Sequence, residues 1–123
     1  MAYQLSKTGA QINTKLQELT VRTLTANGNI AATDGVVILD ATSAECTLSI
    51  VDANIIVGQR LIIYAKAIDN NATIVAAASE DIKGCGLVNS TGLRAQLAGD
   101  CMEIVKVATN LYYITHNYGF QAL

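Results

Sequence analysis

Short apolar runs, broken by turn residues at intervals of roughly eight to twelve positions, constrain this chain of 123 residues more than any other feature. The run "GVVILDA" (35–41) lies between Asp34-Gly35 and Thr42-Ser43, and "CTLSIV" (46–51) alternates apolar and polar side chains. Runs of this length and spacing indicate short strands, since helices need longer segments with a period near 3.6. The pattern therefore predicts an all-β sandwich or barrel.

Further strands are expected along the rest of the chain. The run "RLIIYAKAI" is apolar on both faces, which predicts a central strand, and "DNNA" and Gly99-Asp100 are expected to close hairpins. Parallel neighbours require crossover connections, usually helical, and no interior segment has helical periodicity. We therefore expect a mainly β, antiparallel, jelly-roll-like sandwich or barrel. The later strands are expected at 60–68, 73–78, 101–109 and 110–119, with a short one near Ile82.

The front of the chain differs from this pattern. The stretch "TGAQINTKLQELT" begins with a capping box of Thr8 and Gln11, and its apolar residues fall at Ile12, Leu16 and Leu19. This spacing predicts a short helix with a narrow stripe, like the seam of a coiled coil. Three turns are marginal in water, so the helix needs a partner in its own chain, in sister chains or in a larger body.

The stretch "TVRTLT" (20–25) follows as a strand or an extended arm. We therefore divide the chain into a helix and arm at 1–25, expected to serve attachment and trimerisation, and a β domain at 26–123.

Composition bears on the partners. Apolar residues make up 51% of the chain and charged residues 15%, against a usual ~25%. Such a surface is explained either by sister chains that cover part of it or by an Ala-, Thr- and Asn-rich coat. The net charge is −2 and the eight Lys and Arg residues are scattered, which argues against nucleic acid as a partner. No run is long enough to span a membrane, and "MAYQLSK" is not a signal peptide, so synthesis in a cytoplasm is expected.

No motif predicts catalysis, a metal site or a cofactor. The single histidine, His116, has no neighbouring nucleophile or ligand motif, so we expect a surface position. The three cysteines, Cys46, Cys85 and Cys101, are widely spaced and odd in number, which favours reduced, buried thiols, with Cys85 in a tight turn. The carboxylates fall mostly in turns, where Asp caps its own backbone. We expect a protein that is not an enzyme.

The order of motifs between about residues 30 and 116 resembles the trimeric β modules of tailed-bacteriophage virion proteins, including capsid decoration proteins and head fibres. The matching stretches are "VILD", "TLSI", Gly58–Ile63, Asn71–Ile74, Ile82–Gly84, Leu97–Val105 and the closing strand Leu111–Thr115. That closing strand often carries Trp in the family, where this chain has Tyr112-Tyr113. The opening "YQLSKTGAQINTKLQEL" is similar to the start of many phage fibre and head-fibre proteins.

The resemblance implies a homotrimeric capsid decoration (cement) or head-fibre protein, located on the virion surface and made in the host cytoplasm. Its partners would be sister chains and the major capsid protein. Ile12, Leu16 and Leu19 would meet near the threefold axis, and the N-terminal part would dock on the capsid. Candidate capsid contacts are Tyr3, Leu5, Lys7, Lys15 and Arg22.

An alternative function is host recognition, as a tail-fibre or receptor-binding tip that contacts surface glycans. Exposed aromatic side chains would do this. The candidates are Tyr64, Tyr112, Tyr113, Tyr118 and Phe120, with core packing expected for the first three.

Overall fold

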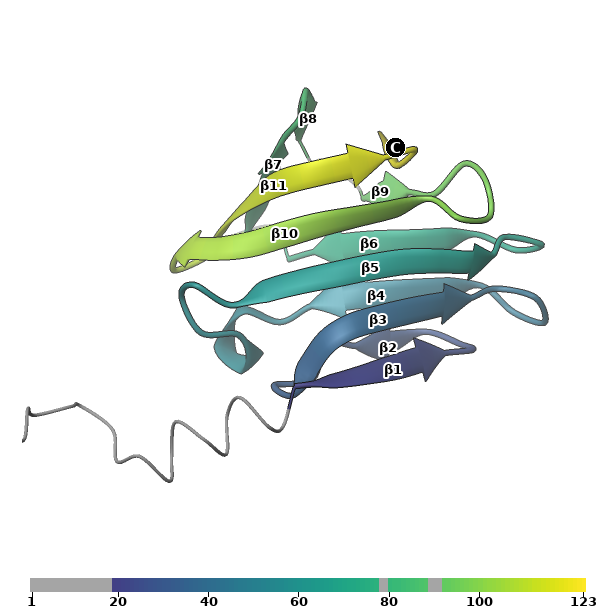
Figure 1. Ribbon diagram of the computed structural model, residues 1–123, viewed down its shortest axis with the longest axis horizontal. Coiled ribbons are helices and arrows are strands. Elements are labelled where there is room, and N and C mark those ends of the chain that lie inside the picture. The colour runs from purple at the N-terminus through teal and green to yellow at the C-terminus, as the bar shows by residue number, and fades with distance from the viewer. Residues whose placement is uncertain (1–18, 78–79, 89–91) are drawn as a thin grey trace, which may run out of the picture.

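The computed structural model describes residues 19–77, 80–88 and 92–123 (Figure 1). The expected N-terminal helix, with Ile12 and Leu16, lies outside the described residues except for its last two positions. Of these, Leu19 precedes the first strand and Thr20 begins it.

Two β-sheets pack face to face in the described part of the chain. In Figure 1 most strands of the larger sheet lie in front of the smaller sheet. The large sheet has the order β1 (Thr20–Leu24), β3 (Asp34–Asp40), β5 (Arg60–Ala67), β10 (Cys101–Ala108), β11 (Leu111–Tyr118), β7 (Asp81–Gly84) and β8 (Leu87–Val88). The small sheet has the order β12 (Gln121–Ala122), β9 (Leu93–Arg94), β6 (Ala72–Ala76), β4 (Cys46–Ile50) and β2 (Gly28–Asn29). One short 3-10 helix, η1 (Asp52–Asn54), links β4 to β5.

The first half of the chain winds between the two sheets. Strands β1, β3 and β5 lie in the large sheet and alternate along the sequence with β2, β4 and β6 of the small sheet. Within each sheet these strands pair in parallel, β1 with β3 and β3 with β5, and likewise β2 with β4 and β4 with β6. Each crossover between two of these parallel neighbours therefore contains a strand of the opposite sheet.

This winding corrects the expected antiparallel topology. The expectation assumed that a parallel pair needs a helical crossover, but a strand on the facing sheet spans the same distance. Both sheets are mixed, because β10 runs antiparallel to β5 and to β11, and β9 runs antiparallel to β6. The segments at 69–72 and at Gly99-Asp100 are not hairpin loops; each carries the chain from one sheet to the other.

Other expectations are confirmed. Of the two possibilities for the stretch 20–25, the strand is observed, at Thr20–Leu24, and β5 is central, between β3 and β10. The Ala-rich stretch after residue 72 is a strand. Because successive side chains in a strand point to opposite faces, every second residue enters the space between the sheets. Residues such as Leu48, Leu61 and Ile104 are completely or almost completely buried there.

A buried polar cluster closes one part of the sandwich around η1. Lys106, on β10, donates from Nζ to the backbone oxygens of Asp52 at 3.0 Å and Ile55 at 2.8 Å, and its ion pair with Asp52 Oδ1 is 3.1 Å. The Asp52 carboxylate also accepts hydrogen bonds from Tyr112 Oη at 2.7 Å and from the Asn110 backbone N–H at 3.0 Å. Burial alone would raise the pKa of Asp52, but these hydrogen bonds outweigh it and lower the pKa. Burial, with the bond to Asp52, raises the pKa of Tyr112.

Candidate functional site: an apolar sheet face

The outer faces of the two sheets differ in chemistry. On the small sheet, the strand pairing aligns Thr47, Thr73, Arg94 and Gln121 in one row across four strands. On the large sheet, the corresponding rows are mostly apolar and aromatic, with a few charged residues among them. We call their outward side chains on β1, β3, β5, β10 and β11 the apolar face: Val21, Thr23, Val36, Ile38, Asp40, Arg60, Ile62, Tyr64, Lys66, Cys101, Glu103, Val105, Tyr113, His116 and Tyr118.

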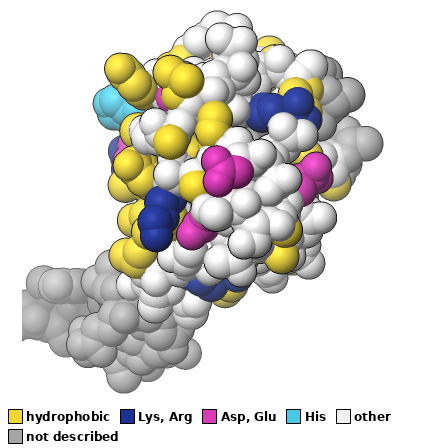
Figure 2. All heavy atoms as spheres, turned by 90° about the vertical axis from the view of Figure 1, so that its right-hand side faces the viewer, with side chains coloured by type: hydrophobic (Ala, Val, Ile, Leu, Met, Phe, Trp, Pro, Cys, Tyr) yellow, Lys and Arg dark blue, Asp and Glu magenta, His cyan; other side chains and the backbone are white. Residues whose placement is uncertain are grey.

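The register of five strands makes this face continuous. One row runs from Ile38 on β3 through Tyr64 on β5 and Cys101 on β10 to Tyr118 on β11. The neighbouring row contains Ile62, beside Glu103. In Figure 2, hydrophobic side chains and the only histidine gather along the left edge, where this sheet is seen in profile.

Large apolar side chains on the face remain open to solvent. Ile62 and Tyr64 are each 40% exposed, and Tyr118 is 74% exposed. Single exposed hydrophobic residues are normal on a protein surface. Here the exposed apolar residues lie on β1, β5 and β11 and are joined by half-buried residues of β3 and β10, and such a continuous patch is typical of an interaction surface.

A β-bulge shapes the part of the face between β10 and β11. The pairing joins Glu103 to His116 and Ile104 to Ile114, which leaves Thr115 as the extra residue on β11. Bulges commonly redirect side chains, and here both Thr115 and His116 are exposed and both contact Glu103. A strict period of two would put Thr115 and His116 on opposite faces, and a bulge leaves no signal in such a pattern, so the sequence does not predict this arrangement.

The charged groups on the face pair within the chain. Glu103 Oε1 accepts a hydrogen bond from Thr115 Oγ1 at 2.6 Å and lies 3.0 Å from Arg60 Nη1 and 3.4 Å from His116 Nδ1. The hydrogen bond from Thr115 contributes most to a lowered pKa of Glu103, against burial and with support from His116 and Arg60. Lys66 Nζ and Asp40 Oδ2 form a second pair, at 3.8 Å. These pairings leave the face with balanced charge.

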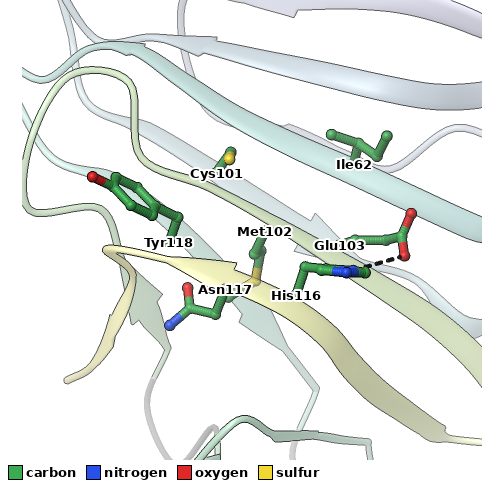
Figure 3. A pocket seen from close by; sticks show the side chains of 7 residues that line it. All are labelled: Ile62, Cys101, Met102, Glu103, His116, Asn117 and Tyr118. Atoms are coloured by element: carbon green, nitrogen blue, oxygen red, sulfur yellow. Dashed lines mark hydrogen bonds and ion pairs between the residues drawn. The ribbon is translucent and has the colours of Figure 1, made fainter.

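A hollow of about 450 Å³ opens on the same face (Figure 3). The Glu103–His116 pair and Ile62 lie at one end, and Tyr118 and Cys101 lie at the other. Its lining is mostly apolar, so it suits an inserted hydrophobic or aromatic side chain better than a charged ligand.

Only some of the residues predicted to contact the capsid or to form the trimer seam lie within the described part of the chain. Arg22 lies on β1 and holds Asp34 through Nε at 2.9 Å and Nη2 at 2.7 Å, while the Asp34 carboxylate also accepts from the Ala31 N–H at 2.8 Å. These contacts tie the edge strand to the start of β3 and, through Ala31, to the β2–β3 loop. The capsid-contact role of Arg22 stays a prediction, as does the seam role of Leu19, which is 38% exposed. The remaining candidates lie outside the described residues: Tyr3, Leu5, Lys7, Ile12, Lys15 and Leu16.

The aromatic candidates divide between the core and the apolar face. Tyr112 and Phe120 are buried, so the core prediction is confirmed for Tyr112. It is wrong for Tyr64 and Tyr113, which point outward and are 40% and 46% exposed. The signal for this surface was present in the sequence, since β5 is apolar on both faces, but a central strand explains that pattern equally well.

The three cysteines and His116 are the remaining side chains that the sequence analysis considered for chemistry. No disulfide joins the three cysteines; Cys46 is buried, Cys101 is partly buried and Cys85 is exposed. The expected burial of Cys85 is therefore wrong, although it does occupy a tight turn, with φ of 50°. His116 is a surface residue, as expected.

Over residues 19–77, 80–88 and 92–123, no cluster of His, Cys, Asp or Glu has the grouping of a metal site. The same ranges contain no helix with the length and hydrophobicity of a membrane span.

Comparison with protein-family models and with curated proteins finds no match to this chain.

Proposed function

We propose that this chain is a structural protein of a tailed-phage virion, a homotrimeric capsid decoration or head-fibre protein that docks through its N-terminal segment. The observation that carries the proposal is the difference between the two outer sheet faces. The small sheet has a polar outer row, whereas the apolar face of the large sheet presents aromatic and aliphatic side chains to solvent. Association would bury the exposed apolar side chains of this face, so the chain is better suited to an oligomer than to a monomer.

The order of motifs between about residues 30 and 116, which resembles that of phage virion modules, supports a virion protein as the identity of this oligomer. In such an assembly three copies bring three N-terminal segments to one body, and linkage raises the effective concentration of each segment at the shell without stronger individual contacts. A trimer that bridges neighbouring capsid subunits would hold the shell against internal pressure.

Two measurements test the proposal. Light scattering of the full chain should give three times the 13.0 kDa mass of one chain. The full chain should also bind capsids assembled without it. A chain lacking residues 1–18 should lose capsid binding while it keeps its trimeric mass, or at least its strand signal. The truncation stops at residue 18 because Thr20–Leu24 is a strand of the large sheet. Equal capsid binding by both chains would refute the docking assignment.

A second candidate, glycan recognition by a fibre tip, is favoured by the aromatic side chains of the apolar face. Tyr64, Tyr113 and Tyr118 offer exposed rings on one surface, and aromatic rings can stack on sugars. A glycan array probed with the full chain would support this function if a signal depended on Tyr118, and the absence of any signal would count against it.

A further inference from the structure

We propose that the apolar face of the large sheet is the surface on which copies of this chain meet. The inference rests on the self-association in the proposed function and adds the site: sheet against sheet, around β5, in addition to any contact between N-terminal segments.

The charge distribution favours a second copy as the occupant. The face carries Arg60 and Lys66 against Glu103 and Asp40, and each cation already pairs with a carboxylate of its own chain. Two such faces can approach without like-charge repulsion. A polyanionic partner would need unpaired cations, whereas Arg60 lies 3.0 Å from Glu103 Oε1 and Lys66 lies 3.8 Å from Asp40 Oδ2.

The size of the face also fits. Five strands about 4.8 Å apart and about 20 Å long give a flat area of roughly 500 Å², to which side-chain relief adds. A stable interface buries about 800 Å² on each partner, so the face supplies a large part of what association needs. The hollow between Tyr118 and His116 would accept an apolar side chain of the neighbouring copy.

The geometry is compatible with three copies. β5 is the middle of the five strands, so a face turned toward a threefold axis places Ile62 and Tyr64 near that axis, with the flanking strands against neighbours. Residues 1–18 join the chain at Leu19, directly before β1, whose Val21 belongs to the same face. The N-terminal segments of associated copies therefore start next to the shared surface.

A matched pair of variants tests the site. Ile62→Lys places a charge at the centre of the apolar face, and Val75→Lys places the same charge on β6, an interior strand of the small sheet, at an outward position beside Ser49. Light scattering should give the mass of one 13.0 kDa chain for Ile62→Lys and three times that mass for Val75→Lys and the unmodified chain. Circular dichroism checks that both variants keep their strands.

Thiol alkylation gives a second readout that needs no substitution. Cys101 lies on the apolar face, whereas Cys85 is exposed in the β7–β8 turn and serves as the internal reference. In the associated chain Cys101 should react severalfold more slowly relative to Cys85 than in Ile62→Lys. Dilution of the unmodified chain should abolish this protection, which keeps the test valid if Ile62→Lys does not fold.

The outcomes separate the two proposals. An Ile62→Lys chain that is folded and still trimeric overturns the apolar face as the interface and leaves the trimer standing. An unmodified chain of 13.0 kDa overturns the trimer and this inference together. If residues 1–18 of the same chain cover the face, their removal will speed Cys101 alkylation in a single chain, and that result also overturns it. A dimer would support the face and refute the threefold arrangement.

Discussion

The hydroxyl of Tyr112 provides a sharp test of the buried polar cluster. Tyr112→Phe keeps the aromatic ring, which is completely buried, so it creates no cavity on the scale of a lost side chain. It removes the 2.7 Å hydrogen bond to the Asp52 carboxylate. Hydrogen bonds to charged groups contribute about 1.5–3 kcal/mol. Asp52 keeps Lys106 and the Asn110 N–H, and its side chain is 16% exposed and can recruit water. We therefore expect a loss of about 1.5 kcal/mol, the lower end of that range.

The assay is urea unfolding at pH 7, at one fixed chain concentration, because association makes the apparent stability concentration-dependent. Tyr113→Phe is the matched control: the neighbouring ring is 46% exposed on the apolar face, and its change should stay within about 0.5 kcal/mol. In an Asp52→Asn background the cost of Tyr112→Phe should fall by roughly half, since hydrogen bonds to neutral acceptors are about half as strong.

The pH dependence supplies a further check. The pKa of Asp52 is lower in the folded chain than in the unfolded chain. The stability it contributes is therefore present above the unfolded pKa of about 3.9 and is lost as the pH falls through the folded value. The difference between the unmodified chain and Tyr112→Phe should narrow over that interval. A cost under about 0.5 kcal/mol at pH 7, or one that does not change on acidification, would refute the role given to this bond.

Three further predictions concern the edge strand, a close backbone approach and acid stability. Asp34→Asn should speed amide hydrogen exchange in β1 while exchange in β10 stays unchanged, because the carboxylate that holds this edge strand is lost; equal acceleration in both strands would contradict this. Gly84→Ala should lower the midpoint of thermal unfolding more than Gly86→Ala, since both have positive φ but only a Cβ at Gly84 would lie 2.6 Å from a β11 carbonyl oxygen; equal shifts would refute the clash. Urea unfolding between pH 6 and 3 should show stability falling below about pH 4, because the pKa values of Asp52 and Glu103 are lowered in the folded chain; a flat profile would contradict it.

The sequence by itself determined where most strands lie and which of their side chains enter the core. In the stretches around β3, β4, β5 and β10, alternating side chains and flanking turn residues are local signals. On β4 the inward positions Cys46, Leu48 and Ile50 follow directly from the period of two, because Thr47 and Ser49 between them are polar. The surface position of His116 and the lack of catalytic motifs were also visible at this level.

Only the tertiary structure decided how those strands pair. Period-two alternation assigns a side chain to a face but carries no information on the neighbouring strand, so a parallel winding through the opposite sheet and an antiparallel meander have the same local pattern. For the same reason the outward Ile62 and Tyr64, the bulge at Thr115, and the cluster that joins Asp52 to Lys106 across 54 positions became visible only once distant segments lay side by side.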